Sequence, residues 1–398
     1  MEDRVTCLLA LGGAGLAAWI ASGVVSRQAF ASIAAGRDVH ARGHHQPIGR
    51  GGGVAVAVPV LLAALCCGWP DFFAVPGIGL AMVAALSISF LVGLADDLRP
   101  LGPLAKFIGQ CVAAAVLATA LAWSDAAWPM LVVAVLLSLW SQNAWNFIDG
   151  SDGLMAMAGI AVFSVGGGLA WHVAAEPGEL VVISGLVVAG LLGFLPWNLP
   201  SARLFLGDAG SLFVGGAYAL CTVLAFQTGP SLGWAWVVLA APVHADVLVC
   251  LGRRVVRGCR WWEGHREHAY QHLVLRRGSH GSALALGSVL WLLVAVPASL
   301  WAIDGGWIAA VMGIGICAVV VAALGSGRPI ESVEAAIPIT DPVEPPVVRV
   351  SRRPPIATPT GLAMARLGNL GMEDREPLAE VAGARASGAA FATAPLRK

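Results

Sequence analysis

Two asparagines and two aspartates interrupt an otherwise apolar part of the chain at NAWNFIDGSDGL, residues 143–154. These polar residues are Asn143, Asn146, Asp149 and Asp152. A polar group without a partner in hydrocarbon costs free energy, so such groups are rare there and usually functional. The segment therefore predicts a site where these side chains face water, a cation or a substrate instead of lipid.

Four more segments place acids, arginines or imidazoles at junctions between apolar runs. They are RDVHARGHHQPIGRGGG (37–53, with Arg42 and His44), GLADDLRPLG (93–102, with Asp96 and Asp97), WNLPSARLFLGDAGSL (197–212, with Asp208) and RWWEGHREHAYQHL (260–273, with His265, Arg266, His268 and His272). The elements between these segments decide whether their side chains can meet.

The residue types in these segments suit one kind of chemistry. Carboxylate and amide oxygens are ligands for hard cations such as Mg²⁺ or Mn²⁺. Arginine and protonated histidine suit the opposite charge of a pyrophosphate. A glycine-rich turn such as GDAGS lets backbone N–H groups approach a phosphate at a helix start. Together they predict metal-assisted phosphoryl transfer from a soluble donor to an acceptor held in lipid.

The composition identifies the elements that must position these groups. Of the 398 residues, 58% are hydrophobic and 12% are charged, whereas a soluble domain is roughly a quarter charged. We therefore predict an all-α, polytopic membrane protein with about eleven transmembrane helices and the bilayer as its surroundings. The predicted spans are 5–25, 51–69, 75–95, 104–123, 128–146, 154–172, 180–196, 209–226, 232–251, 282–302 and 304–325. The net charge of zero predicts no nucleic-acid partner.

The basic residues predict the orientation of these spans. Each junction takes the number of the span before it. The even-numbered junctions (70–74, 124–127, 173–179, 227–231 and around 303) contain no Lys or Arg, whereas the odd-numbered junctions carry many Arg residues. By the positive-inside rule the odd junctions face the cytoplasm, the N-terminus lies outside and the C-terminus inside. Every polar segment described above then falls on the cytoplasmic side. This arrangement is typical of a catalytic face rather than of a permeation path.

Two further features concern the domains and the cysteines. Residues 1–325 form the predicted membrane domain, and residues 326–398 are rich in Pro, Ala and small polar residues. That composition predicts a disordered cytoplasmic tail. The eight cysteines contain no C-x-x-C pair, so we expect neither a disulfide framework nor a thiolate metal site.

Several polar residues also have structural explanations that the sequence leaves open. Asp208 could cap the helix that follows it, and Asn143 could clamp a turn. Asp96 and Asp97 could pair with Arg99 or Lys106, and since adjacent helical residues point about 100° apart, we expect only one of them to face the site. If helical, His265, His268 and His272 share one face, as a solvated stripe would. We expect Asp246 to pair with a neighbouring helix.

Four of the motifs, in their order, resemble those of a known family. The Asp96–Asp97 pair, NAWNFIDGSDGL, FLGDAGSLFVGG and HREHAYQHL are similar to successive cytoplasmic signatures of the polyprenyl-phosphate N-acetylhexosamine-1-phosphate transferases, glycosyltransferase family 4. HREHAYQHL most resembles the branch that initiates O-antigen or related surface glycans. The resemblance covers residues 35–325.

The resemblance implies a reaction and a location. Undecaprenyl phosphate attacks the β-phosphorus of a UDP-amino sugar, UMP leaves, and sugar-pyrophosphoryl-undecaprenol remains. We prefer direct transfer over a covalent enzyme intermediate, because no residue is singled out as a nucleophile. The family acts in the bacterial cytoplasmic membrane. A homodimer is one oligomeric state that remains open, and the sequence does not select the sugar.

The resemblance also assigns roles to residues. Asp208 corresponds to the principal Mg²⁺ ligand and Asn146 to a second. Asp96 and Asp97 resemble the acidic pair near the lipid phosphate, and Asp149 and Asp152 resemble acids on the nucleotide side. His265, Arg266 and His268 resemble the basic loop that holds pyrophosphate and sugar, with His272 beside it. Asn143 is a further candidate for substrate binding.

One segment departs from the family pattern, and two other classes compete. DVHARGHHQPIGRGGG is shorter than the usual loop after the first span and lacks its first proline, which makes the alignment of Arg42, His44 and Gly52 uncertain. DGSDGLMA partly resembles the CDP-alcohol phosphatidyltransferases, but Met157 stands where they have arginine. A transporter would place ionisable groups at mid-membrane, whereas here they gather at one interface.

Overall fold

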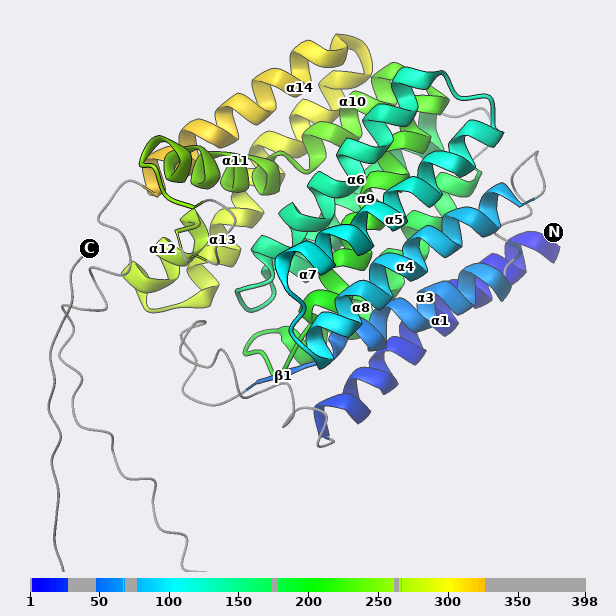
Figure 1. Ribbon diagram of the computed structural model, residues 1–398, viewed down its shortest axis with the longest axis horizontal. Helices are drawn as coiled ribbons and strands as arrows, with labels where there is room; N and C mark the ends of the chain where they lie inside the picture. Colours follow the sequence, from blue (N-terminus) through cyan, green and yellow to red (C-terminus); the bar gives the residue numbers. More distant parts are fainter. Residues whose placement is uncertain are drawn as a thin grey trace, which may run out of the picture. The chain divides into compact units, whose positions relative to one another are not determined.

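Apolar sequence forms long helices in the computed structural model, which describes residues 2–27, 48–66, 68, 77–173, 178–260, 265 and 267–325. Helix formation satisfies every backbone group locally, as an element in lipid must. The elements are α1 (Glu2–Arg27), β1 (Gly49–Arg50), α3 (Gly52–Cys66), α4 (Ile78–Leu98), α5 (Pro103–Trp123), α6 (Trp128–Ile148), α7 (Leu154–Val173), α8 (Glu179–Asn198), β2 (Leu204–Phe205), α9 (Gly207–Thr228), α10 (Pro230–Leu239), α11 (Ala241–Val256), α12 (Ala269–Arg277), α13 (His280–Leu290), the π-helical turn η3 (Trp291–Ala295) and α14 (Val296–Leu324) (Figure 1). The predicted class, a helical membrane protein, is confirmed.

The number of spans differs from the eleven predicted. Among the described residues, eight helices are long and apolar enough to cross a membrane, and a bent pair makes up to nine. Helix α3 has 15 residues, which is shorter than the roughly 20 that span a bilayer. The 45 residues from the start of α13 to the end of α14 are counted as one of the eight candidate spans. The count of eleven is therefore not confirmed.

This last segment folds back on itself. Gly306 has a positive φ of 55° and interrupts the helical backbone of α14. Arg276, just before α13, donates from Nη1 to the carbonyl oxygen of Leu324 at 3.1 Å. The end of α14 therefore returns to the level at which α13 begins, as in a helical hairpin.

A buried polar network occupies the bend between α10 and α11, whose axes differ by 62°. Pro242 lies in the first turn of α11, where its missing N–H costs nothing. Trp140 donates to Nδ1 of His244 at 3.0 Å, and Nε2 of His244 lies 3.2 Å from the Tyr218 hydroxyl. That hydroxyl donates to the carbonyl oxygen of Trp236 at 3.2 Å, in the last turn of α10. The network thus satisfies a carbonyl that the bend leaves without a helical partner.

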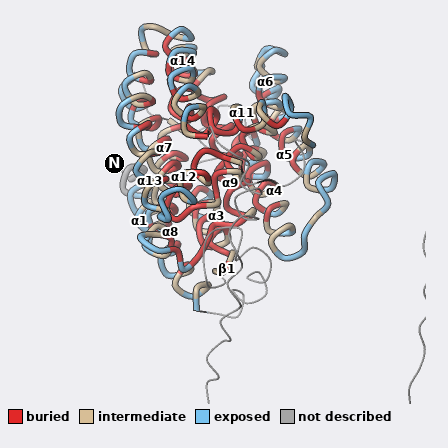
Figure 2. The backbone as a smooth tube through the Cα atoms, turned by 90° about the vertical axis from the view of Figure 1, so that its left-hand side faces the viewer, coloured by how far each residue is buried: buried red, intermediate tan, exposed pale blue. Residues whose placement is uncertain are grey.

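Helix α9 lies at the centre of the helices and is buried along almost its whole length (Figure 2). Two glycines allow close approach to its first turn. A side chain at Gly93 of α4 would meet the backbone of Asp208, and one at Gly53 of α3 would meet the backbone of Gly210. Close contact of three helices therefore fixes the position of the GDAGS segment.

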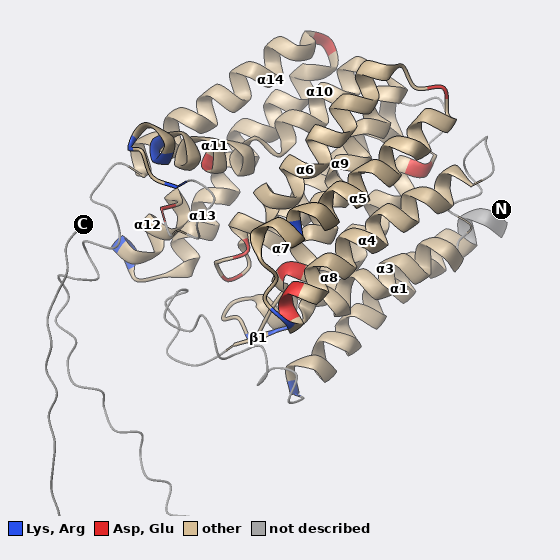
Figure 3. Ribbon diagram, viewed as in Figure 1, with Lys and Arg blue, Asp and Glu red and all other residues tan. Residues whose placement is uncertain are grey.

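Two short strands brace the same end of α9. Strands β1 and β2 pair in parallel, with Gly49 opposite Leu204 and Arg50 opposite Phe205. In the described residues, Lys and Arg lie toward the helix ends that carry β1 and α12, whereas Asp and Glu lie at both ends (Figure 3). The loop with Arg42 and His44, and residues 326–398, lie outside the described residues. The predicted disorder of the tail stays a prediction.

The charge distribution predicts which ends of the helices face the cytoplasm, and cysteine labelling can test this. In a chain whose native cysteines are replaced by serine, Ser124→Cys and Glu179→Cys should react with an impermeant thiol reagent in intact cells. Ser201→Cys should react only after the membrane is opened, because its junction is basic and we predict that it faces the cytoplasm. Labelling of Ser201→Cys in intact cells would reverse the orientation.

Candidate active site

The N-terminus of α9 is held by carboxylates from two other elements. Asp97 of α4 accepts from the backbone N–H of Asp208 at 3.0 Å and of Ala209 at 2.8 Å. Asp149, at the end of α6, accepts from the N–H of Gly207 at 2.9 Å. The first N–H groups of a helix have no internal acceptor and carry positive partial charge. Asp97 and Asp149 therefore cap α9 from outside.

Because α9 is already capped, the side chain of Asp208 points elsewhere. It pairs with the ammonium of Lys106 in α5, whose Nζ also lies 3.5 Å from Oδ2 of Asp96. Oδ1 of Asp96 accepts from the N–H of Leu101 at 2.7 Å. We call Asp96, Lys106 and Asp208 the charge cluster. The explanation of Asp208 as a helix cap is wrong, and Asp96 is the member of the acidic pair that faces the cluster.

Lys106 is a site residue that the sequence analysis named only as a partner for the acidic pair. It stands one turn into an apolar run, and the only other lysine of the chain is Lys398. Four residues separate the end of α4 at Leu98 from the start of α5 at Pro103. The two helices are therefore antiparallel neighbours, and this short turn brings the ammonium to Asp96. A lone lysine inside a predicted span was the signal that could have identified it.

Asn146 joins the charge cluster from α6. Its Nδ2 donates to Oγ of Ser211 at 2.8 Å, and its amide interacts with the Asp208 carboxylate. Asn143, one turn earlier in α6, has a different partner. Its Nδ2 donates to Gln110 of α5 at 3.0 Å, and Gln110 donates back at 3.3 Å. Asn143 therefore clamps α5 to α6 rather than a turn, and its substrate contact stays a prediction.

Asp152 is buried and supports the loop before α9. Its Oδ2 accepts from the N–H of Ala202 at 3.1 Å, and its Oδ1 lies 3.9 Å from Nδ1 of His280. Like Asp149, it binds the 199–207 segment, as the bonds to Ala202 and Gly207 show. The predicted role of both acids on the nucleotide side stays a prediction.

The histidines lie in a loop and a helix, not on one helical face. Helix α12 begins at Ala269, so His265 is outside it and His268 directly precedes it. The three histidines do not lie on one helix, so the shared helical face that the sequence left open does not form. Asp246 of α11 binds Nδ1 of His268 at 3.1 Å and the N–H of Ala269 at 2.7 Å. Asp246 thus pairs with a neighbouring helix, as expected. Arg266 lies outside the described residues.

The charge state of His265 differs from the sequence-based expectation. Burial, together with the smaller effects of the neighbouring His268 and Arg254, lowers its pKa to about 4. His265 is therefore neutral at pH 7 in the substrate-free protein, and only a bound anion would favour its cationic form. Burial, followed by Arg276, also lowers the pKa of His272 in α12.

The end of α6 connects the charge cluster to the histidines. The ring of Phe147 lies against those of His265 and His268, with centroid distances of 5.8 and 5.3 Å. Tyr270 of α12 donates to the carbonyl oxygen of Phe147 at 2.9 Å. Residues 146–149 therefore contact α9 on one side and the histidine loop on the other. Four of the five sequence segments come together here, and the fifth, with Arg42 and His44, lies outside the described residues apart from 48–53.

Comparison with known proteins identifies the family of the chain. Residues 79–226, which contain the charge cluster, match the sequence profile of glycosyl transferase family 4. The chain is 32% identical to the decaprenyl-phosphate N-acetylglucosaminephosphotransferase of Mycolicibacterium smegmatis, over 72% of this chain and 79% of the relative. It is 33% identical to the phospho-N-acetylmuramoyl-pentapeptide-transferase of Symbiobacterium thermophilum, over 55% of this chain and 75% of the relative.

A third relative covers less of both chains. It is the undecaprenyl-phosphate alpha-N-acetylglucosaminyl 1-phosphate transferase of Thermotoga maritima, 31% identical over 42% of this chain and 53% of the relative. None of the three names refers to O-antigen, so the narrower resemblance to that branch stays a prediction.

The different positions of Asp96 and Asp97 predict different effects on stability. Asp97→Ala removes two charge-assisted bonds to backbone N–H groups, at about 1.5–3 kcal/mol each when made to a charged group. It should lower the melting temperature of the detergent-solubilised protein clearly. Asp96→Ala removes one such bond and also relieves the crowding of two carboxylates around Lys106, so its effect should be smaller. Equal shifts for the two variants would show that Asp97 does not cap α9.

Proposed function

The chain belongs to glycosyl transferase family 4, and from that premise we propose that it transfers N-acetylhexosamine 1-phosphate from a UDP-amino sugar to undecaprenyl phosphate. An oxygen of the lipid phosphate bonds to the β-phosphorus of the donor. The bond from that phosphorus to the bridging oxygen breaks, and UMP leaves with the electron pair. The relatives are named as phosphotransferases of decaprenyl or undecaprenyl phosphate, which supports this assignment.

The observation that carries the proposal is the charge cluster at the start of α9. Asp96, Lys106 and Asp208 come from three different apolar helices, and each lies within one turn of a helix end. A lipid phosphate at the membrane surface and a water-soluble nucleotide can both reach such a position. The Lys106 ammonium can form charge-assisted hydrogen bonds to a phosphate. Its two carboxylate partners already hold it in a fixed position and partly out of water.

The same residues fit a divalent cation. Asp208 and Asn146 offer the hard oxygen ligands that Mg²⁺ or Mn²⁺ prefers. The ammonium of Lys106 lies between Asp96 and Asp208, as a cation between two carboxylates does. Asp208 and Asn146 would hold the metal, and Asp96 would face it. When bound, the metal would neutralise charge on the phosphoryl oxygens of the donor.

The histidine loop supplies the second half of the proposed site. His265 and His268 stack beside Phe147, next to the segment that contains Asn146. Their ring nitrogens can donate to a pyrophosphate, whose charge would raise the pKa of His265 from its low substrate-free value. We assign this loop to the donor pyrophosphate and sugar. The finer assignment, initiation of an O-antigen-like surface polysaccharide, rests on the HREHAYQHL sequence alone.

The proposal predicts a defined product and a metal requirement. Purified protein given undecaprenyl phosphate and a UDP-N-acetylhexosamine should release UMP and form a lipid-linked sugar pyrophosphate, both detectable by mass spectrometry. Chelation with EDTA should abolish release, because the carboxylates would then repel the donor pyrophosphate. Added Mg²⁺ or Mn²⁺ should restore it.

The choice of donors makes this test informative. UDP-N-acetylglucosamine and UDP-N-acetylgalactosamine are assayed side by side, with UDP-glucose as a control that lacks the acetamido group. UMP release that does not depend on the lipid phosphate would contradict transfer to that acceptor. Full activity in EDTA would contradict the metal.

A further inference from the structure

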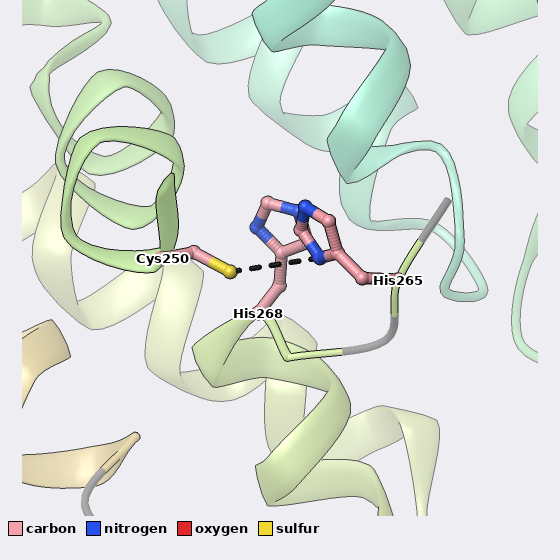
Figure 4. A group of neighbouring side chains, drawn as sticks. All are labelled: Cys250, His265 and His268. Carbon is pink, nitrogen blue, oxygen red and sulfur yellow. Dashed lines mark hydrogen bonds between the residues drawn. The ribbon is translucent and has the colours of Figure 1, made fainter. Parts of the chain in front are cut away.

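Three side chains with soft or borderline metal-ligating atoms gather beside the proposed donor site. Cys250 of α11, His265 and His268 each offer a ligand atom, and these atoms all lie within 4.8 Å of one another. Sγ of Cys250 lies 3.7 Å from Nδ1 of His265, and the two imidazole rings lie next to each other (Figure 4). Cys250 has no part in the transfer reaction proposed above.

The spacing matches a tetrahedral zinc site. With Zn–S and Zn–N bonds of about 2.3 and 2.1 Å, adjacent sulfur and nitrogen ligands lie about 3.6 Å apart. The Cys250–His265 distance of 3.7 Å agrees with this value. Two imidazoles on one tetrahedral ion have centroids about 5 Å apart, and the rings of His265 and His268 have centroids 5.1 Å apart.

A second observation also points to a ligand. The Nε2 atom of His268 is buried and has no hydrogen-bond partner in the described residues, and His268 is only 1% exposed. Buried polar atoms normally have a partner. Nδ1 of His268 is bound to Asp246 at 3.1 Å, which leaves the lone pair on Nε2. A metal-binding histidine usually donates the N–H of its other ring nitrogen to a carboxylate, which fixes the orientation of the ring.

We propose that Cys250, His265 and His268 bind Zn²⁺ or a similar soft divalent cation, with a fourth position left to water. Thiolate and imidazole select such ions, whereas the oxygen ligands around Asp208 select Mg²⁺. The Cys250 thiol gives up its proton as the S–Zn bond forms. A cysteine 15 residues before a histidine matches no recognisable zinc motif, so the sequence alone does not predict this thiolate site.

The proposed site has a regulatory consequence, which rests on the proposed function. An ion bound to His265 and His268 occupies the ring nitrogens assigned to the donor pyrophosphate. Zn²⁺ should therefore inhibit transfer and compete with the UDP-sugar, even when Mg²⁺ is saturating. Release of Zn²⁺ would restore the donor site.

Metal binding is tested without reference to activity. Full-length protein purified without a polyhistidine tag is titrated with Co²⁺, whose bond to a thiolate gives charge-transfer absorption in the near ultraviolet. The wild type should bind one equivalent with this absorption, and Zn²⁺ should displace it. Cys250→Ser should lose the absorption and bind at least 100-fold more weakly. Cys259→Ser, in the segment after α11 and outside the cluster, is the matched control and should behave as the wild type.

Two results would overturn the site. One is wild-type protein that gives no thiolate–cobalt absorption, and the other is Cys250→Ser that binds as tightly as Cys259→Ser. His268→Gln provides a second variant, in case Cys250→Ser does not fold as judged by its melting temperature. It should weaken Co²⁺ binding while the thiolate remains.

The activity measurement separates this inference from the proposed function. Cys250→Ser should keep basal UMP release and lose inhibition by micromolar Zn²⁺, whereas Cys259→Ser should keep both. Inhibition that persists unchanged in Cys250→Ser would contradict the regulatory site. Protein that binds Co²⁺ through Cys250 but releases no UMP would refute the proposed function and leave the metal site standing.

Discussion

The capping of one buried helix by carboxylates from other helices determines the arrangement of the site. Helix α9 begins inside the protein, where water cannot satisfy its first N–H groups. Asp97 and Asp149 accept these groups. Because the cap comes from outside α9, Asp208 in its first turn needs no local partner and can face Lys106. Asp97 therefore supports the fold by capping α9, whereas its neighbour Asp96 lies beside Lys106 in the candidate site.

This division of roles places charge where apolar helices meet water. Lys106 and Asp208 both lie within helices that are otherwise apolar enough to span a membrane. Neither charge would be stable in such a position alone. Paired, with Asp96 and Asn146 beside them, they form a polar site at the ends of these helices. A transferase with one soluble and one lipid substrate needs a site of this kind.

Much of the fold was predictable from the sequence, because apolar runs and their boundaries are local properties. The convergence of the polar segments followed from their alternation with spans. The individual roles did not. Asp96 and Asp97 are adjacent in sequence, and only the packing of α4 against α9, through Gly93, decides that Asp97 caps the helix. The reversal of α14 at Gly306 likewise depends on one backbone conformation, which the two apolar runs on either side of it do not reveal.

The central claim is that the negative charge of Asp208 holds the catalytic cation. Asp208→Asn keeps the size of the side chain and removes that charge, and the caps from Asp97 and Asp149 remain. Metal stabilisation of phosphoryl oxygens supplies several kcal/mol, and each ~1.4 kcal/mol is tenfold in rate. At saturating Mg²⁺ and both substrates, turnover of the folded variant should fall at least about 1,000-fold below wild type. Turnover near that of the wild type would contradict the claim.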